Sequence, residues 1–381
     1  MARDVEVAVV GGGVVGCAVA HQLAARGVAT LLLEARDGLA QEASGSNSGI
    51  LHTGFDSHPG ELETELILES GRIRPPLLEA LGVPVRRCGA RLRAAGEEQL
   101  AAVRALAANA SGNGVAADLR EGGRELLVPG ESITDPVTFT EALATRAAAG
   151  GAEIRLGTPA VALSRAAGGI RVELAGGGAV DAAGVANCAG LHADELAAGA
   201  GDGSFALYPR KGEFLVFEQP AEPLEEILLP VPSPAGKGVL VFPTLDGHVI
   251  AGPTARDRTD KDDWSVEADA AELILERARR SYAPLEGAEP IAAYAGLRPA
   301  GRGANYAIGA SSALPGLVNA AAIRSTGVTA APAIGERVAA LVIAAAGLRA
   351  GAARELPRLP SRAPSAPWWA LAAERSAGAP A

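Results

Sequence analysis

The N-terminal part of the chain alternates apolar runs with one Gly-rich break. Residues 5–10, Val-Glu-Val-Ala-Val-Val, predict a short buried strand because valine dominates and proline is absent. Apolar side chains four residues apart then predict a helix from about residue 14 to residue 26, which stops at Gly27. Residues 29–33 predict a second strand, which ends at Glu34. This order of strand, turn, helix, strand and terminal acid predicts a nucleotide-binding unit.

The Gly-rich break has the features of a turn that binds a pyrophosphate. Gly11 allows the tight turn, Gly13 lets the backbone approach the phosphates, and Gly16 lets the helix pack against the strand. Free N–H groups at the helix N-terminus would meet the anion, and the Glu34 carboxylate would bind the hydroxyls of an unphosphorylated ribose. A Gly-rich linker does not explain this order of elements. A signal peptide is excluded because it would carry positive charge where Asp4 stands.

A different pattern follows over residues 206 to about 300. Short strand-like segments, such as residues 238–243 and 248–251 around an Asp-Gly turn, replace the helical periodicity. This change predicts a second, antiparallel domain inserted into the nucleotide-binding one. Residues 86 to about 130 are assigned to the same second domain.

The composition excludes several classes of protein. A chain of 381 residues with 48% hydrophobic content can bury the cores of two domains. Its net charge of −10 gives no basic surface for nucleic acid. The five histidines form no metal-binding pattern, and three widely spaced cysteines indicate a reducing cytoplasm. The apolar run at residues 338–348 is too short to span a bilayer, so we expect a soluble or membrane-peripheral protein.

The loop after Glu34 carries a more specific pattern. Small polar residues lead into Asn47-Ser48-Gly49-Ile50-Leu51-His52-Thr53-Gly54, and Pro59-Gly60 follows. Further matching segments are Asn187-Cys188-Ala189-Gly190, Tyr208-Pro209-Arg210-Lys211-Gly212-Glu213, Gly296-Leu297-Arg298-Pro299 and Ser325-Thr326-Gly327-Val328-Thr329. With these segments the chain resembles the FAD-dependent oxidoreductases of the D-amino-acid-oxidase superfamily. The resemblance is to the branch of L-2-hydroxyglutarate oxidase and the flavin-linked glycerol-3-phosphate oxidases and dehydrogenases.

This resemblance implies an α/β fold with a Rossmann-type FAD-binding domain and an inserted α+β substrate domain. The FAD-binding domain is expected over residues 1–85, 131–205 and 301–381, and the substrate-binding domain over residues 86–130 and 206–300. FAD is expected to bind noncovalently, because none of the cysteines resembles an attachment site. The residues expected at FAD are Gly11, Gly13, Val14, Val15, Gly16, Glu34, Ala35, Ser44, Ser46, Asn47, Ser48, Gly49, Val161, Ala189, Gly190, Gly327, Val328 and Thr329.

The resemblance also indicates which residues carry the chemistry. His52 is the expected base, since imidazole transfers protons near neutral pH; the alternative is a loop histidine with a structural hydrogen bond. Arg298 is expected to hold the substrate anion, because arginine binds carboxylate or phosphate with two donors; the alternative is a surface arginine. Further substrate contacts are expected from Ser48, Lys211, Arg324 and Ser325.

Thr329 is expected to cap the N-terminus of a helix that runs through residues 331–346. This helix N-terminus would face the flavin and stabilise negative charge there. The tail, residues 357–381, is expected to be disordered or to form a packed strap, and a peripheral membrane contact through Trp368 and Trp369 is the alternative.

The function expected from this pattern is oxidation of the CH–OH group of a small anionic substrate by hydride transfer to FAD. Glycerol 3-phosphate and L-2-hydroxyglutarate are the two substrate types, and oxygen, a quinone or another carrier would reoxidise the flavin. Two alternatives share the fold. One is an oxidase of amino acids or secondary amines, and the other is a flavin-binding protein without catalytic activity.

Overall fold

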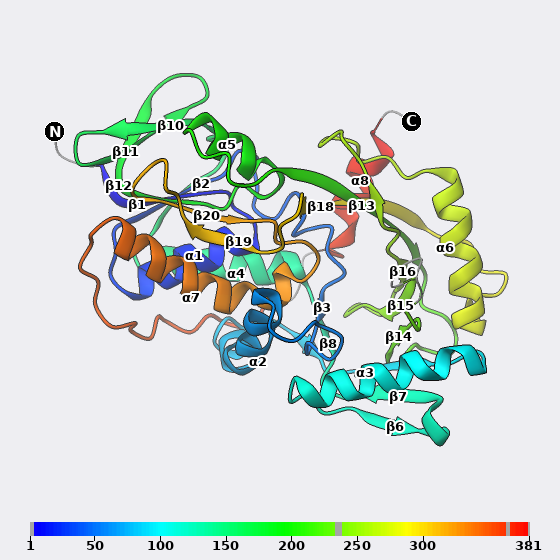
Figure 1. The fold of residues 1–381 in the computed structure, drawn as a ribbon. Helices are drawn as coiled ribbons and strands as arrows, with labels where there is room; N and C mark the ends of the chain where they lie inside the picture. The colour runs from blue at the N-terminus through cyan, green and yellow to red at the C-terminus, as the bar shows by residue number, and fades with distance from the viewer. Residues whose placement is uncertain (1–3, 233–237, 363–365, 380–381) are drawn as a thin grey trace.

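Two large β-sheets at opposite ends of the molecule organise the chain, and helices cover both (Figure 1). The structure is a computed structural model that describes residues 4–232, 238–362 and 366–379. The first sheet has eight strands and the second has nine, and a small three-stranded sheet connects them. The mixed α/β fold with one largely parallel and one largely antiparallel sheet is confirmed.

The first sheet is built around the predicted N-terminal unit. β1 (Val5–Val10) pairs in parallel with β2 (Thr30–Leu33) on one side and with β12 (Ala179–Asn187) on the other, and α1 (Val14–Ala25) connects β1 to β2. β9 (Glu153–Arg155) and β20 (Leu317–Ala321) extend the parallel part. The antiparallel strands at its edges are β10 (Ala160–Ala166), β11 (Gly169–Leu174) and β19 (Ala307–Ala310).

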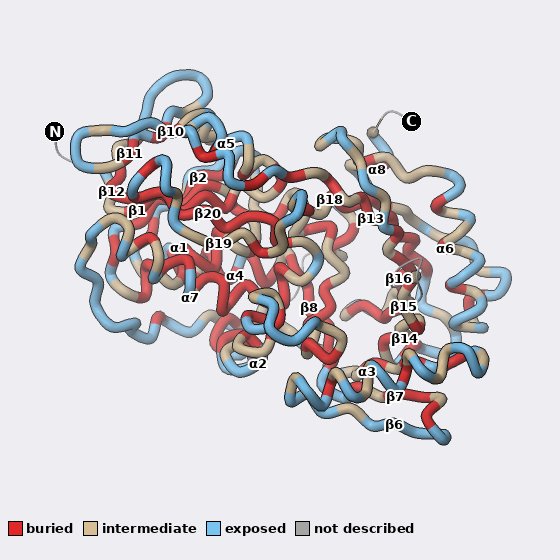
Figure 2. Tube along the Cα trace, viewed as in Figure 1, coloured by how far each residue is buried: buried red, intermediate tan, exposed pale blue. Residues whose placement is uncertain are grey.

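Both faces of this sheet are buried, which explains why β1 is apolar at nearly every position. Val7 and Val9 face a core shared with α1, α4 (Pro136–Ala149) and α7 (Gly327–Ala345), which lie on one side of the sheet (Figure 1). Ala8 and Val10 face a second core with β11 and α5 (Ala193–Gly199). A strand covered on both faces has no position for a solvated side chain. Figure 2 shows the resulting continuous buried layer.

The second sheet joins segments from two separate parts of the chain. β13 (Leu207–Phe217) and β18 (Ala292–Gly301) form its longest antiparallel pair, with Arg210 opposite Arg298. β15 (Leu240–Pro243) and β16 (Val249–Gly252) form the expected hairpin around the Asp-Gly turn. The remaining strands are β5 (Ala90–Arg93), β6 (Asp118–Arg120), β7 (Glu125–Val128), β14 (Ile227–Leu229) and β17 (Arg256–Asp257). α3 (Leu100–Gly112) and α6 (Ala268–Ser281) pack against this sheet.

The small connecting sheet fixes the loop that the sequence singled out. β3 (Ile50–Leu51) pairs antiparallel with β8 (Ser132–Thr134), and β8 pairs with β4 (Val85–Arg86). α2 (Leu62–Ala80) follows this loop and packs against α7. The short 3-10 turns are Glu97–Gln99, Glu121–Gly123, Gly190–His192 and Ala283–Leu285. The loop at residues 47–54 is therefore held between the two large sheets.

The capping predictions have different outcomes at two helices. At α4, the Asp135 carboxylate accepts the N–H groups of Val137 and Thr138 at 2.9 Å, as its N-cap position predicts. At α7 the prediction was wrong: the helix begins at Gly327, and Thr329 lies inside its first turn. The Thr329 hydroxyl is not a cap because it donates to the carbonyl of Ile50 at 3.1 Å.

The C-terminal tail ends in a packed helix, α8 (Trp369–Ala377). Trp368 and Trp369 are only 5% and 9% exposed and belong to a core with strands of the second sheet, so they form no exposed apolar patch. Among the described residues, only α7 is long and apolar enough to cross a membrane. Some 61% of the apolar stretch of this helix is buried inside the protein, as in a core helix.

Candidate active site and cofactor cavity

A cavity of 440 Å³ opens at the carboxyl ends of β1 and β2, beside the Gly-rich turn. This is the edge of a parallel sheet where nucleotides bind. Most of its lining comes from the turn, the loop after β2 and the segment after β12. The residues expected at FAD that line it are Gly11, Gly13, Glu34, Ala35, Ser44, Val161, Ala189 and Gly190.

The geometry of the turn requires its glycines. Gly11 has a φ of +107°, and a Cβ atom there would lie 2.3 Å from the carbonyl oxygen of Cys188. A Cβ atom on Gly16 would lie 1.9 Å from the carbonyl oxygen of Gly11. Both contacts are with backbone, which cannot move aside cheaply. The turn is thus closed by the first turn of α1 and by the segment after β12, and only glycine fits at Gly11 and Gly16.

Glu34 lies at the floor of this cavity and is 9% exposed. Its carboxylate accepts the N–H of Gly12 at 2.5 Å and the N–H of Arg36 at 2.7 Å. Burial raises the pKa of Glu34, and backbone hydrogen bonds from Arg36, Gly12 and Ala35 oppose part of this rise. A carboxylate has about four acceptor positions, so acceptor capacity remains for a ribose hydroxyl. The donor set and the cavity fit an adenosine diphosphate group.

Two further groups at the cavity have local roles. The Ser44 hydroxyl accepts the N–H of Val14 at 3.0 Å, at the open N-terminus of α1. Val14, Val15 and Gly16 lie in that first helical turn and are not among the residues that line the cavity. Burial raises the pKa of the Cys188 thiol to about 12, so this cysteine is a protonated, inert wall of the cavity.

The remaining residues expected at FAD gather elsewhere, around the N-terminus of α7. The Asn47 side chain donates to the carbonyl of Ser325 at 3.1 Å and accepts the N–H of Gly49 at 2.9 Å. Trp368 donates its indole N–H to the carbonyl of Asn47 at 3.1 Å. The loop is therefore tied to α7 on one side and to the tail on the other. Gly327, Val328 and Thr329 form the first turn of α7, whereas Ser46 and Ser48 lie in the loop itself and Ser46 packs against Gly296 of β18.

His52 stands at the end of β3 within this second group. The backbone N–H of His52 donates to the Thr329 hydroxyl at 3.0 Å. The ring nitrogen Nδ1 lies 3.0 Å from Oε2 of Glu131. Its side chain is 23% exposed, so the imidazole remains accessible at one edge. Arg74 of α2 donates to the carbonyl oxygens of His52 and Thr329 at 3.3 and 2.9 Å. Sequence reasoning missed both Glu131 and Arg74.

The pairing of His52 with Glu131 follows from strand register. Leu51 is opposite Ser132 in the antiparallel pair of β3 and β8, so the next residue outward on each strand faces the other. Glu131 is 79 residues away from His52 in the sequence. In the sequence, Glu131 is recognisable only as a carboxylate directly before a short apolar strand, and this pattern does not indicate which residue it contacts.

Arg298 extends from β18 across the neighbouring strand. It lies opposite Arg210, and its guanidinium passes over Gly212, where a Cβ atom would lie 1.9 Å from Nη2. One hydrogen bond holds it, from Nη2 to the carbonyl of Thr254 at 2.6 Å. Burial, and then the charges of Arg210 and Arg324, lower the pKa of Arg298 to about 10. Gly212 thus makes room for a guanidinium that an alanine would exclude.

Arg298 differs from the other two arginines in its partners. Arg210 binds both carboxylate oxygens of Asp257, at 2.6 and 3.1 Å, and Arg324 lies 3.4 Å from Glu63. Within residues 4–232, 238–362 and 366–379, no carboxylate lies at ion-pair distance from Arg298. A partly buried cation without a carboxylate is costly, and an external anion would relieve this cost.

Lys211 does not join this group. It is opposite Leu297 in the ladder, so its side chain leaves the sheet on the face opposite to that of Arg298. The ammonium group is fully buried and binds Asp263 at 2.8 Å and Ser265 at 3.0 Å. These contacts occupy Lys211 in the second sheet, and the geometry does not support the expected contact with substrate.

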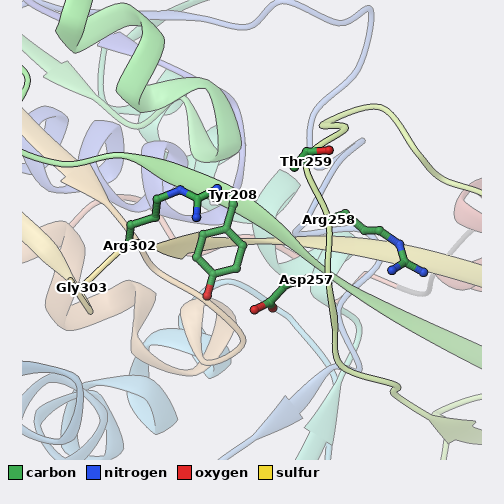
Figure 3. A pocket seen from close by; sticks show the side chains of 7 residues that line it. Tyr208, Asp257, Arg258, Thr259, Arg302 and Gly303 are labelled. Atoms are coloured by element: carbon green, nitrogen blue, oxygen red, sulfur yellow. The ribbon is translucent and has the colours of Figure 1, made fainter.

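A second cavity, of 570 Å³, opens on the same face of the β13–β18 ladder as Arg298. Tyr208, Arg302 and Asp257 surround one space in it, whereas Arg258 points away (Figure 3). The Arg302 guanidinium lies 5.1 Å from the centre of the Tyr208 ring.

The fold and this site define an FAD-dependent oxidoreductase, and comparison with known proteins agrees. The chain belongs to the DAO family of FAD-dependent oxidoreductases, whose model matches residues 6–341. It is 29% identical over 345 residues to a glycerol 3-phosphate dehydrogenase of Caloramator mitchellensis, covering 86% of this chain and 72% of that protein. It is 29% identical over 289 residues to an L-2-hydroxyglutarate dehydrogenase of Escherichia coli, covering 70% and 68% of the two chains.

A solved structure shows the same fold with the cofactor in place. The dithionite-reduced L-alpha-glycerophosphate oxidase from Mycoplasma pneumoniae, with FAD bound, superposes with a TM-score of 0.83. It is 26% identical in sequence, and the match covers 94% of this chain and 97% of that one. The predicted family and the predicted FAD cofactor are therefore confirmed.

Proposed function

We propose that this protein oxidises the CH–OH group of a small anion of the glycerol 3-phosphate or L-2-hydroxyglutarate type. The observation that carries the proposal is Arg298, a half-buried guanidinium that lacks a carboxylate partner among the described residues. Relatives named for these two substrates support the choice. Arg298 is suited to either ligand, because a guanidinium binds carboxylate and phosphate with the same two-donor geometry.

One loop contacts both the strand that carries Arg298 and the helix beside His52, which supports a joint site. Ser46 packs against β18, since a Cβ atom on Gly296 would lie 2.7 Å from its hydroxyl. His52 ends the same loop at the first turn of α7. A substrate whose anion is held by Arg298 would thus be enclosed by residues 46–52, the segment that the family pattern identifies.

When bound, FAD supplies the hydride acceptor, and the protein supplies the other requirements of alcohol oxidation. Arg298 holds the anion and orients the carbon that loses hydrogen. His52 accepts the hydroxyl proton. Arg324, Ser48 and Ser325 lie at the N-terminus of α7 and are proposed as further substrate contacts. Glu34 and the Gly-rich turn hold the adenosine diphosphate end.

Anaerobic stopped-flow spectroscopy tests this proposal. Oxidised protein is mixed with glycerol 3-phosphate, L-2-hydroxyglutarate, D- and L-lactate, sarcosine or glycine, and the loss of flavin absorbance is followed. One of the first two compounds is expected to reduce the flavin fastest. Fast reduction by sarcosine or glycine alone would assign the protein to the amine oxidases. No reduction by any compound would favour a flavoprotein without this activity.

The electron acceptor belongs to the same proposal and is tested separately. Reduced protein is mixed with air-saturated buffer or with a soluble quinone, and the return of the flavin absorbance is timed. Reoxidation by oxygen within the turnover time identifies an oxidase. Reoxidation by the quinone alone identifies a dehydrogenase.

A further inference from the structure

A fully buried carboxylate, Glu131, lies directly behind His52. Its side chain has 0% exposure and comes from the turn that precedes β8. Oε1 accepts two hydrogen bonds from Thr53, from the backbone N–H at 2.7 Å and from the hydroxyl at 2.8 Å. Oε2 lies 3.0 Å from Nδ1 of His52. Each oxygen of Glu131 thus contacts a neighbouring residue of the same loop.

These contacts determine which nitrogen of His52 carries the proton. Two donors occupy Oε1, so the proton shared by the carboxyl group and the imidazole lies on the contact between Oε2 and Nδ1, and imidazole is the stronger base of the two groups. The contact of Glu131 with Nδ1 therefore requires a proton on Nδ1. In a neutral imidazole the other nitrogen, Nε2, is then the unprotonated one. Nε2 is the atom that can accept a proton from a substrate hydroxyl.

We infer that Glu131 is a positioning residue that holds His52 in the Nδ1-protonated form and stabilises the imidazolium formed during turnover. The inference rests on the proposed role of His52 as the base. The hydroxyl proton of the substrate passes to Nε2, His52 becomes a cation, and Glu131 keeps its negative charge beside Nδ1. The carboxylate touches neither substrate nor cofactor and acts through the imidazole.

The other charged groups around the pair are consistent with this role. Arg74 approaches from α2 and binds the backbone carbonyl of His52, not its ring. Burial lowers the pKa of Arg74 to about 10, and the negative charge of Glu131 opposes this decrease. Asp56 follows in the same loop. Glu131 contacts the ring itself, at Nδ1.

The variant Glu131→Gln tests the inference because its hydrogen bonds can form in only one orientation. A backbone N–H can only donate, so the amide oxygen must face Thr53. The amide NH₂ then faces Nδ1, which must accept, and the proton of the neutral ring moves to Nε2. The limiting rate of flavin reduction is expected to fall on the order of 10²–10⁴-fold, with FAD still bound.

Nitrogen-15 NMR of holoprotein with labelled histidine shows which ring nitrogen of His52 carries the proton, and it needs no turnover. The His52 signal is assigned by its loss in His52→Gln. In the neutral imidazole, wild type is expected to show Nδ1–H and Glu131→Gln is expected to show Nε2–H. An unchanged tautomer in Glu131→Gln would overturn the inference, whatever the rate.

Two further variants separate positioning from loop structure. Thr53→Val removes the hydroxyl bond to the same carboxylate but keeps the N–H bond, so it is expected to cost at most about fivefold in rate and to keep the tautomer. A loss as large as that of Glu131→Gln would indicate a structural role and overturn the inference. Glu131→Asp serves if Glu131→Gln does not fold, because the shorter carboxylate can bind Thr53 but not reach Nδ1. Reduction by Glu131→Asp at the wild-type rate would also overturn the inference.

The kinetics also separate this inference from the proposed function. If flavin reduction is slow in His52→Gln but has the wild-type rate in Glu131→Gln, His52 remains the base and the role inferred for Glu131 is wrong. If His52→Gln itself reduces at the wild-type rate, the base assignment fails and the inference fails with it.

Discussion

The two ends of the candidate cofactor site are built in different ways. At the nucleotide end, one continuous segment, residues 5–36, supplies the strand, the turn and the side-chain carboxylate of Glu34. At the catalytic end, side chains from separate elements meet: His52 follows β3, Glu131 precedes β8, and Arg298 lies on β18. Binding of the nucleotide therefore depends on local chain geometry, whereas the chemistry depends on how the sheets are joined.

This difference predicts that substitutions at one end leave the other end working, and the largest effect is expected at His52. His52→Gln should slow flavin reduction on the order of 10²–10⁴-fold because the base for the hydroxyl proton is lost. FAD content should be that of wild type. The measurement is anaerobic reduction by the best substrate of the panel, across the pH range. A wild-type rate at every pH would show that another residue is the base. Loss of FAD would show that the catalytic end also affects binding of the nucleotide.

Arg298 gives the next largest effect. Arg298→Ala should lower kcat/KM by roughly 10²–10³-fold, since a buried charge-assisted contact with the anion is lost and the substrate is held loosely. Arg298→Lys should recover part of this loss, because lysine keeps the charge but not the planar two-donor fork.

A neutral analogue provides the control for Arg298. Reduction by glycerol should be nearly the same in wild type and Arg298→Ala, because glycerol has no anionic group for Arg298 to bind. Equal losses for glycerol and for the anionic substrate would show that Arg298 does not recognise the anion. Such a result would contradict the proposed substrate class.

The same difference explains what could be predicted from the sequence. The β1–α1–β2 unit, the Asp135 cap and the hairpin of β15 and β16 are local patterns, and the structure confirms them. Glu131 could not be predicted, because only the register of β3 with β8 brings it to His52. Lys211 was expected to contact the substrate, but successive residues of a strand face opposite sides of a sheet, and Asp263 and Ser265 bind its ammonium group on the face opposite to Arg298. The prediction of a Thr329 cap was wrong because the Thr329 hydroxyl donates to the carbonyl of Ile50 in β3. This is a tertiary contact, which the sequence pattern of a helix cannot indicate.

The nucleotide end should also respond to acid, through His21 in α1. His21 is 6% exposed, and burial, followed by the charges of Arg146 and Arg26, lowers its pKa from 6.5 to about 4. Below pH 6.5 the unfolded chain therefore binds a proton that the folded protein does not. Stability should fall as the pH decreases from about 6.5 to about 4, by about 3 kcal/mol in total.

Urea unfolding of the holoprotein at several pH values measures this effect, with His21→Gln as the matched control. The variant does not titrate at this position, so its free energy of unfolding should decrease less than that of wild type over this pH range. Parallel curves for the two proteins would show that His21 is not the group responsible. Flavin reduction at pH 7 should be the same in both.

The smallest effect is expected at Glu34, and it tests the nucleotide end directly. Glu34→Ala should weaken FAD binding by about 1–3 kcal/mol, the cost of losing hydrogen bonds between a carboxylate and the ribose hydroxyls. Part of this loss reflects the turn itself, since the N–H groups of Gly12 and Arg36 lose their acceptor. Glu34→Gln loses only one of these two acceptors, because its amide oxygen accepts on one side and its NH₂ faces the other backbone N–H. Titration of apoprotein with FAD measures the affinities, and the reduction rate of the FAD-saturated variants should equal that of wild type. Unchanged affinity in Glu34→Ala would show that this carboxylate supports the turn without binding the ribose. A slowed reduction at saturation would show that the two ends of the site are not independent.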